Sequence, residues 1–152
     1  MKSNSWALDL MRLVLQNEPA TLLGDAAGLI GSSTPGNVFI ALHVSDPGRG
    51  GSQTTGEANF GGYVRVPVPR TKSRWTVELI NPDMGPARGS NATLIAFPEC
   101  TSGENKITHA SVGTSATGTG KLIYSGQLVQ PMPVSIGIIL EFKVGDIAFS
   151  EA

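Results

Sequence analysis

The apolar segment at residues 38–44 (VFIALHV) constrains the fold of this chain more than any other stretch. Three of its residues are β-branched, which favours a pleated strand because such side chains lose little rotamer freedom there. The segment is also too short for a buried helix, and turn residues bound it on both sides. Residues 31–37 (GSSTPGN) precede it, and Asp46, Pro47 and Gly48 follow it. Pro47 fixes φ, Gly48 tolerates φ > 0, and Asp46 can bond its own backbone. We therefore predict a buried central strand with a sharp exit.

The composition also favours strands and turns. The chain of 152 residues holds 19 Gly and 10 Pro, and only 15% of its residues are charged, which indicates many turns and few surface helices. A formal net charge of −1 argues against nonspecific binding to nucleic acid, and a single cysteine, Cys100, excludes an internal disulfide framework. No apolar segment reaches the ~18 residues of a membrane span, and no secretory signal is evident. We expect a soluble protein with no nucleic-acid or membrane partner.

An amphipathic helix is predicted near the N-terminus. Residues 6–16 (WALDLMRLVLQ) follow possible capping residues at 3–5, and Pro19 ends the pattern. A narrow polar stripe leaves the rest of the helix surface apolar. Its members recur at spacings of four, three and four: Ser5, Asp9, Arg12 and Gln16. This apolar surface either packs on its own domain or docks in part on a partner subunit. A second, poorer helix is predicted at 21–30.

Short strands are predicted along the rest of the chain. Residues 63–70 (YVRVPVPR) alternate strictly, which places Val64, Val66 and Val68 on one face and Tyr63, Arg65 and Pro67 on the other. Pro67 and Pro69 restrict this segment to a sheet edge, and Pro131 with Pro133 is expected to break the chain. Further strands are expected at 74–80, 92–97, 107–113, 121–128, 134–144 and 146–149. Their even spacing predicts an antiparallel β-sandwich or jelly-roll-like domain at 38–152, preceded by a helical segment and linker at 1–37.

Candidate catalytic and metal-binding residues are few. His43 and His109 both lie in predicted strands, where they could pair as metal ligands or as a base and its orienting group. A zinc site needs three or four ligands, and Cys100 has no spacing that would add it. Residues 113–121 (GTSATGTGK) depart from the phosphate-loop motif at Ser115 and Leu122. No nucleophile elbow is present. We therefore expect no catalytic residue, no metal and no cofactor.

Several ordered motifs carry a resemblance. They are ALHVSDPG at 41–48, the polar loop GSQTTGEANF, GGYVRVPVPR at 61–70, TH at 108–109 and TGTGKLIYSGQL at 118–128. Together they resemble a family of small tailed-phage virion proteins, whose members are labelled head decoration (cement) proteins or tail fibre proteins. The family pattern has ALHTADPG and GYARV at the first and third positions, so this chain departs from it at Val44 and Ser45. The likeness spans roughly residues 38–134.

This resemblance implies a non-enzymatic virion structural protein. The first hypothesis is a capsid decoration protein that binds the major capsid protein on the outer capsid surface, stabilises the shell, and forms a dimer or trimer. It would be assembled into the virion in the cytoplasm of the bacterial host. The alternative is a tail-fibre or baseplate-associated adhesin that binds a host receptor, and a small hydrolase is a distant third. The expected partner contacts are Trp6, Leu10, Met11 and Val14 of the helix, with Arg49, Gln53, Glu57 and Phe60 of the polar loop at 48–62, whose length indicates a functional or mobile segment.

Overall fold

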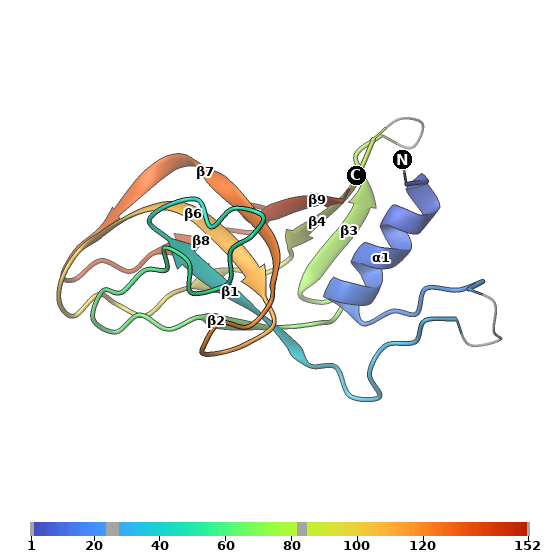
Figure 1. The fold of residues 1–152 in the computed structure, drawn as a ribbon, viewed down its shortest axis with the longest axis horizontal. Helices are drawn as coiled ribbons and strands as arrows, with labels where there is room; N and C mark the ends of the chain where they lie inside the picture. Colours follow the sequence, from blue (N-terminus) through green and yellow to red (C-terminus); the bar gives the residue numbers. More distant parts are fainter. Residues whose placement is uncertain (1, 24–27, 82–84, 152) are drawn as a thin grey trace. The chain divides into compact units, whose positions relative to one another are not determined.

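The computed structural model describes residues 2–23, 28–81 and 85–151 (Figure 1). The chain forms two compact units, which are described separately here. The first unit comprises Met1–Gly36, Pro69–Leu94 and Lys143–Ala152, and the second comprises Asn37–Val68 and Ile95–Phe142. The N-terminal helix therefore shares its unit with two later segments of the chain.

The predicted class, mainly antiparallel β with an N-terminal helix, is confirmed. The described residues contain a single helix, α1 (Asn4–Gln16). Their strands are β1 (Asn37–His43), β2 (Val66–Pro69), β3 (Trp75–Leu79), β4 (Ala87–Asn91), β5 (Ile95–Ala96), β6 (Asn105–Gly113), β7 (Leu122–Val134), β8 (Glu141–Phe142) and β9 (Ala148–Glu151). The pairings β1–β6, β6–β7, β3–β4, β4–β9 and β5–β8 are all antiparallel.

In the first unit, α1 packs against the sheet β3-β4-β9. The helix begins where Ser3 Oγ accepts a hydrogen bond from Trp6 N (3.3 Å) and ends at Asn17 in the left-handed region (φ 58°). Its buried residues recur every four positions, at Ala7, Met11 and Leu15. A Cβ at Gly89 of β4 would lie 2.4 Å from Leu15 Cδ1, so the glycine allows close approach of helix and sheet.

The C-terminal end of α1 is capped by an arginine from later in the chain. Arg70 Nε donates to Val14 O (2.7 Å) and Arg70 Nη2 donates to Leu13 O (2.5 Å). Both carbonyls lie in the last turn, where backbone acceptors lack helical partners and a cation is favoured by the helix dipole. Gln16 Nε2 adds a hydrogen bond to Trp75 O (2.8 Å). The end of the helix is therefore fixed to the strand segment that follows β2.

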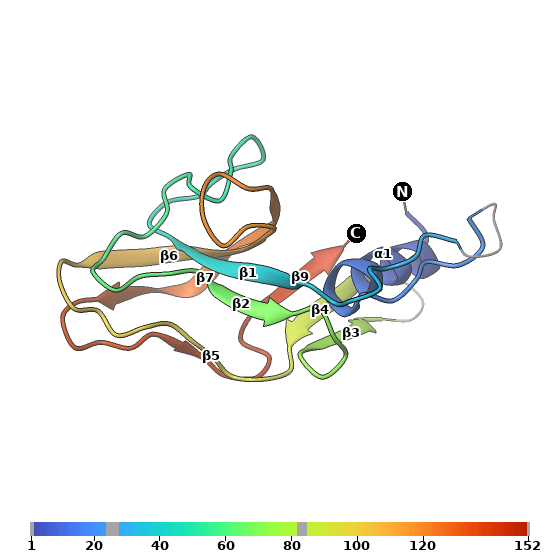
Figure 2. The ribbon, with the colours of Figure 1, turned by 90° about the horizontal axis from the view of Figure 1, so that it is seen from below.

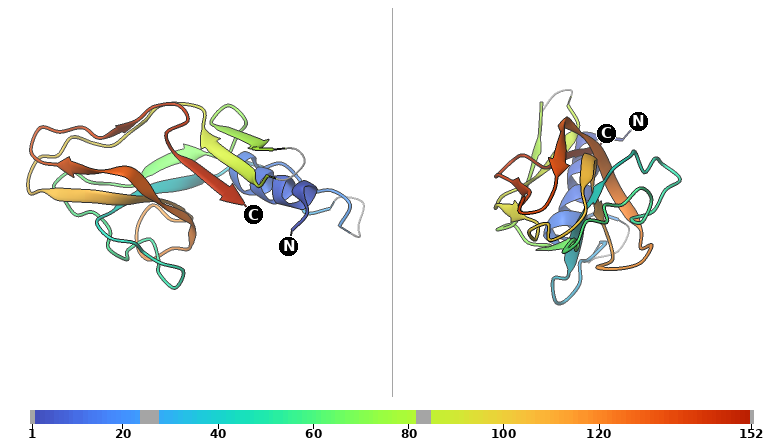
Figure 3. Two further views of the ribbon diagram at one scale, coloured as in Figure 1. Left: turned by 90° about the horizontal axis from the view of Figure 1, so that it is seen from above. Right: turned by 90° about the vertical axis from the view of Figure 1, so that its left-hand side faces the viewer.

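The second unit contains a four-stranded sheet, in the order β2-β1-β6-β7, and the two-stranded ribbon β5-β8. The ribbon lies apart from the four-stranded sheet as a second layer (Figures 2 and 3). The predicted central strand is confirmed as β1, which has neighbours on both sides, and β2 is confirmed as an edge strand. The β1–β6 register places buried apolar side chains on one face of this sheet: Ile40, Leu42, Ala110 and Val112.

The opposite face of β1 and β6 is polar at its centre. Register pairs His43 with His109 and Ala41 with Ser111, and strand alternation puts all four on the same face. Gly113, the partner of Phe39, continues this face at the end of β6. A buried polar face of this kind requires partners for its side chains, and the loops of the second unit provide them.

Several expected boundaries were wrong. Pro131 and Pro133 lie inside β7, where the edge position of the strand and a register shift after Ile107 tolerate residues without an N–H. The strand β4 lies outside the strands expected from the sequence, since its residues (ARGSN) show no apolar alternation. Only β5 and β8 form within the strands expected at 92–97 and 134–144. In the helix expected at 21–30, Ala20 instead pairs with Leu29, and residues 24–27 lie outside the described part.

Candidate functional site

Two polar loops of the second unit meet over the polar face of β1 and β6. We call residues 48–62 and 114–120 together the loop platform. The two loops are joined directly, because Gln53 N donates to Thr119 O (3.0 Å). The first loop also extends the sheet beyond β2, since Ala58 N donates to Leu42 O and Val44 N donates to Gly56 O, each at 2.8 Å. The platform is therefore bound to the sheet through its backbone.

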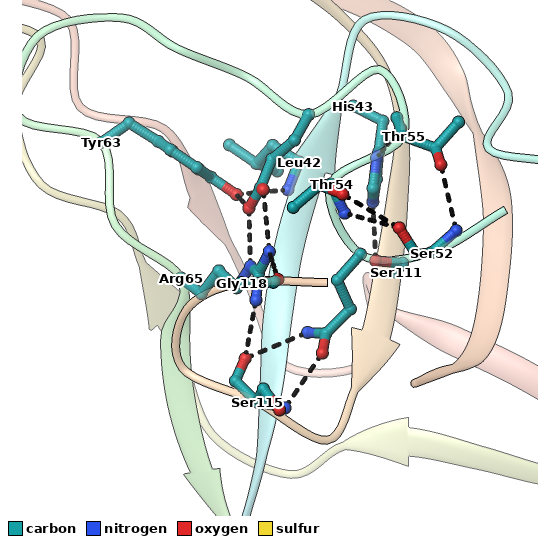
Figure 4. Close-up of polar contacts among 12 residues, drawn as sticks. Leu42, His43, Ser52, Thr54, Thr55, Tyr63, Arg65, Ser111, Ser115 and Gly118 are labelled. Carbon is teal, nitrogen blue, oxygen red and sulfur yellow. Dashed lines mark hydrogen bonds and ion pairs between the residues drawn. The ribbon is translucent and has the colours of Figure 1, made fainter. Parts of the chain in front are cut away.

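The Glu57 and Arg65 side chains form the charged centre of the platform. Figure 4 shows Arg65 between Tyr63 and Ser115. Arg65 Nε donates to Glu57 Oε1 (2.6 Å) and Arg65 Nη2 donates to Glu57 Oε2 (2.8 Å). The Arg65 side chain is only 3% exposed and that of Glu57 16% exposed. The hydrogen bond to Glu57 raises the pKa of Arg65, although burial opposes this shift. Such a fork-to-fork geometry fixes the orientation of both side chains.

Arg65 also reaches the second loop of the platform. Its Nη1 donates to Ser115 O (2.9 Å) and its Nη2 to Gly118 O (2.7 Å). On the other side of the carboxylate, the Tyr63 hydroxyl donates to Glu57 Oε1 (2.9 Å) and accepts from Leu42 N (3.1 Å). Burial raises the pKa of Tyr63, so its hydroxyl stays protonated. One ion pair thus connects both loops to the backbone of β1.

Gln53 makes a second connection between the loops, and it is completely buried. Its Nε2 donates to Ser115 O (3.2 Å), and its Oε1 accepts from Ser115 N (2.9 Å). The side chain lies directly against Gly113, where a Cβ would come within 2.1 Å of Gln53 Cδ. The Gln53 amide therefore forms the two hydrogen bonds that a neighbouring strand would otherwise offer to the backbone of Ser115. It has room to do so because residue 113 is a glycine.

His43 is a fully hydrogen-bonded core histidine. Its Nδ1 lies 2.8 Å from Thr55 O and its Nε2 lies 2.7 Å from Ser111 Oγ. Because a carbonyl only accepts, Nδ1 carries the proton, and Ser111 Oγ donates to Nε2 when the ring is neutral. Desolvation by burial lowers the pKa of His43. The hydrogen bond to Thr55 and the Glu57 charge oppose this shift, whereas the charges of His109 and Arg65 add to it. His43 and Ser111 are both 0% exposed, so this pair faces no surface a substrate could reach.

The four loop residues expected to contact a partner differ in their exposure to solvent. Arg49 is exposed, whereas Gln53, Glu57 and Phe60 point inward and support the platform from beneath. Phe60 packs edge-on against Tyr63 (5.3 Å between ring centroids), and Tyr63 stacks on Phe97 (6.1 Å). The loop is thus held at many points, contrary to what its polar composition predicts.

The expected helix contacts also divide into two groups. Met11 is fully buried within its own unit, with Ala7 and Leu15. Trp6, Leu10 and Val14 form a neighbouring stripe at the same four-residue spacing, and each is half-buried. This stripe leaves apolar helix surface accessible, as do the half-buried side chains of Leu8 and Leu13.

The sequence interpretation missed Tyr63, Arg65 and Ser115. The strict alternation predicted at 63–70 was wrong at its start, because Val64 is 58% exposed whereas Val68 is buried, and Arg65 is also buried (6% exposed). The available signal was Glu57, a carboxylate that can reach an arginine in the strand eight residues later. Ser115 contributes backbone groups alone, which no side-chain pattern reveals.

The described residues show neither a metal-binding cluster nor a membrane-spanning helix. They contain no group of three or more His, Cys, Asp or Glu side chains that could hold a metal ion. Asn91 begins an Asn-Ala-Thr triplet, the sequence pattern of a glycosylation acceptor. Its amide is buried and donates to Thr93 O and Lys143 O, each at 2.9 Å. In the same described ranges, no helix combines the length and apolar character that a membrane span requires.

Comparison with known proteins identifies the family of this chain. A family model described as "Podophage GP4 fiber I protein gp80" matches residues 20–150. The matched region includes the strands β1 to β8, the first three residues of β9 and both loops of the platform. No curated protein matches the chain. The chain therefore belongs to the podophage GP4 fiber I protein gp80 family and is a structural protein of a tailed-phage virion.

Proposed function

We propose that this protein is a non-enzymatic structural subunit of a phage fibre, in which the loop platform forms a rigid, outward-facing surface. The match of residues 20–150 to a family named for a fibre protein is the observation that carries this proposal. The buried ion pair of Glu57 and Arg65 supports it, since it holds two glycine-rich loops in one arrangement. A rigid surface loses less conformational entropy on contact than a flexible one.

A non-enzymatic role is supported by the chemistry of the platform. The Ser111 hydroxyl and the His43 imidazole beneath the platform are both buried, and His43 is also hydrogen-bonded to Thr55 O. A nucleophile must meet its substrate, so this pair stabilises the fold instead. The half-exposed stripe of Trp6, Leu10 and Val14 is the surface we propose for attachment to neighbouring virion subunits, including further copies of this chain as a dimer or trimer.

Capsid decoration is the second candidate function. The motifs at 41–48 and 118–128 resemble those of proteins labelled head decoration proteins, and this role would make the major capsid protein the partner. In that role, many copies on the capsid surface would add weak contacts into a stable shell. The structural framework is the same in both candidates, and the position in the virion separates them.

The location of the protein on the particle tests the proposal. Phage particles carrying a small epitope tag at the C-terminus of this chain would be labelled with gold-conjugated antibody and imaged by electron microscopy. We expect gold along fibres. Gold spread over the faces of the capsid would overturn the fibre role and favour decoration.

A binding experiment provides an independent check. Purified protein would be mixed with expanded capsids that lack it, and co-sedimentation measured. The fibre role predicts no saturable binding to such capsids, whereas decoration predicts saturation at a fixed ratio to the major capsid protein. A Leu10→Ser, Val14→Ser variant would test the attachment stripe in whichever assembly the protein joins, with exposed Lys121→Ser as its control.

A further inference from the structure

A cleft of about 650 Å³ lies between the turn at residues 46–51 and the strands β6 and β7 of the second unit. This volume falls within the range of small-molecule sites. Its walls are formed by Asp46, Gly48, Arg49 and Gly51 on the loop side and by His109, Leu122, Ile123, Ser125, Gly126 and Gln127 on the sheet side. The cleft lies on the same face of the sheet as His43, because Gln127 pairs with His109 and His109 with His43.

The loop wall of the cleft is held in place. Asp46 Oδ1 accepts from Gly48 N (2.9 Å), which closes the turn, and Gly48 adopts φ 66°. Gly51 N then donates to Gly48 O (3.2 Å). A Cβ at Gly51 would lie 2.0 Å from Pro47 O, so only glycine permits this path. The cleft is therefore already formed in the absence of a ligand, which lowers the cost of binding.

On the sheet side of the cleft, the imidazole ring of His109 is held by a neighbouring threonine. Thr108 Oγ1 lies 2.9 Å from His109 Nδ1 and 3.5 Å from His43 O. The contact to Thr108 holds the ring through Nδ1 and leaves His109 Nε2 for a ligand. His109 itself lines the cleft.

The polar groups that line the cleft are largely unused within the chain. Among the described residues, the side chains of Arg49, Ser125 and Gln127 have no hydrogen-bond or ion-pair partner. Asp46 Oδ1 accepts the hydrogen bond that closes the turn, and Asp46 Oδ2 is left for a ligand. Donors and acceptors are thus both available, next to the apolar side chains of Leu122 and Ile123.

We propose that this cleft binds a neutral saccharide. The lining holds one carboxylate, at Asp46, and one guanidinium, at Arg49, so their charges balance and the pair gives a net anion or a net cation no overall attraction. A sugar hydroxyl both donates and accepts, so it satisfies Asp46 and Arg49 at once. Leu122 and Ile123 offer an apolar surface to the C–H face of a pyranose ring. The proposal goes beyond the fibre role, since binding by the isolated chain does not depend on where the protein sits in the virion.

The two histidines of the chain make a direct test possible. His109 lines the cleft and His43 is buried beneath the platform, so imidazole resonances of protein with ¹⁵N-labelled histidine report the cleft and an internal control separately. The probes are methyl glycosides of glucose, galactose, mannose and rhamnose, N-acetylglucosamine, and disaccharides of these sugars. For at least one probe we expect saturable shifts of the His109 signals, with those of His43 unchanged.

Variants of exposed residues establish that the cleft is the binding site. The double variant Arg49→Ala, Gln127→Ala should weaken binding by roughly tenfold or more, since it removes one charged and one neutral hydrogen-bonding group. Gln130→Ala is the matched control, because Gln130 is exposed on the same strand and does not line the cleft. Ser125→Trp, which would fill the cleft from an exposed strand position, is a second blocking variant.

Three outcomes would overturn the assignment. The first is that none of the probes moves the His109 signals. The second is that a probe binds the double variant and Ser125→Trp as tightly as the parent chain. The third is that only N-acetylneuraminic acid or glucuronic acid binds, which would make the ligand anionic. None of these results bears on the location of the protein, which the gold labelling decides.

Discussion

The Glu57 carboxylate and the Arg65 guanidinium share two hydrogen bonds, of 2.6 and 2.8 Å, at the point where both loops of the platform meet β1. Neither residue has a local structural reason to face inward. The pair stays ordered because each remaining polar atom around it has a partner, from Tyr63 on one side to Gly118 on the other. The stability of the platform therefore depends on this pair being complete.

Arg65→Met should lower the free energy of unfolding by about 3 kcal/mol, because it leaves the Glu57 carboxylate partly buried without its counter-charge. Denaturant unfolding measures this loss. Replacement of both residues, as Glu57→Leu with Arg65→Met, should cost less than the sum of the single changes. Arg49→Ala is the control, with an expected change within about 0.5 kcal/mol, since Arg49 is exposed. A loss at Arg65 no larger than at Arg49 would contradict this account.

Stability should fall as the pH is lowered below the ordinary His43 pKa of 6.5. Burial lowers the pKa of His43 in the folded state, so between the folded and unfolded values the unfolded chain binds more protons. Protonation then favours unfolding. The melting temperature should therefore decrease between pH 7.5 and 5.5, an interval bracketing ~6.5. His43→Gln should be less stable at high pH, and its melting temperature should change less across this interval than that of the parent protein. Equal slopes in the two proteins would refute the role of His43.

Gly113→Ala should destabilise the protein by about 1–3 kcal/mol, because the new Cβ would collide with the buried Gln53 side chain. Hydrogen exchange in residues 114–120 should increase with it. Gly50→Ala is a matched control in the other loop, where a Cβ meets no atom within 4 Å. Adding Gln53→Ala to Gly113→Ala should recover part of the loss if the collision is its cause; a fully additive double variant would exclude that explanation.

Arg70→Met should cost about 1–2 kcal/mol, since two carbonyls of the last turn of α1 lose charge-assisted hydrogen bonds. Arg70→Lys should restore the protein only in part, because an ammonium lacks the planar fork that reaches both oxygens. Arg88→Met is the comparison, since Arg88 and Glu78 are 3.8 Å apart and both substantially exposed. The proposed capping is wrong if Arg70→Met and Arg88→Met unfold at the same denaturant concentration.

Local chemistry allowed some elements to be predicted closely. The turn after β1 forms as expected, with Asp46 bonded to Gly48 N and a positive φ at Gly48. The prolines at 67 and 69 correctly restricted β2 to an edge. The same reasoning failed for β7, because an edge strand also accommodates Pro131 and Pro133, and whether a strand lies at an edge depends on the whole sheet.

The loop platform lay beyond such prediction. Gln53 and Phe60 belong to a loop that appears solvated by composition, yet both are buried. The groups that bury Gln53 come from Ser115, 62 residues later, and from the missing side chain of Gly113. A polar side chain can be buried only when its hydrogen bonds are met, and these partners are distant in sequence.

The sequence by itself determined the mainly β class, the N-terminal helix, the buried central strand and its exit turn, since each depends on backbone preferences and apolar periodicity within a few residues. Only the tertiary structure decided that Glu57 and Arg65 pair, that the loops cover the polar face of β1 and β6, and that a cleft opens beside His109. These features depend on which segments come together in space, because the free energy of a buried polar group is set by its non-local partners.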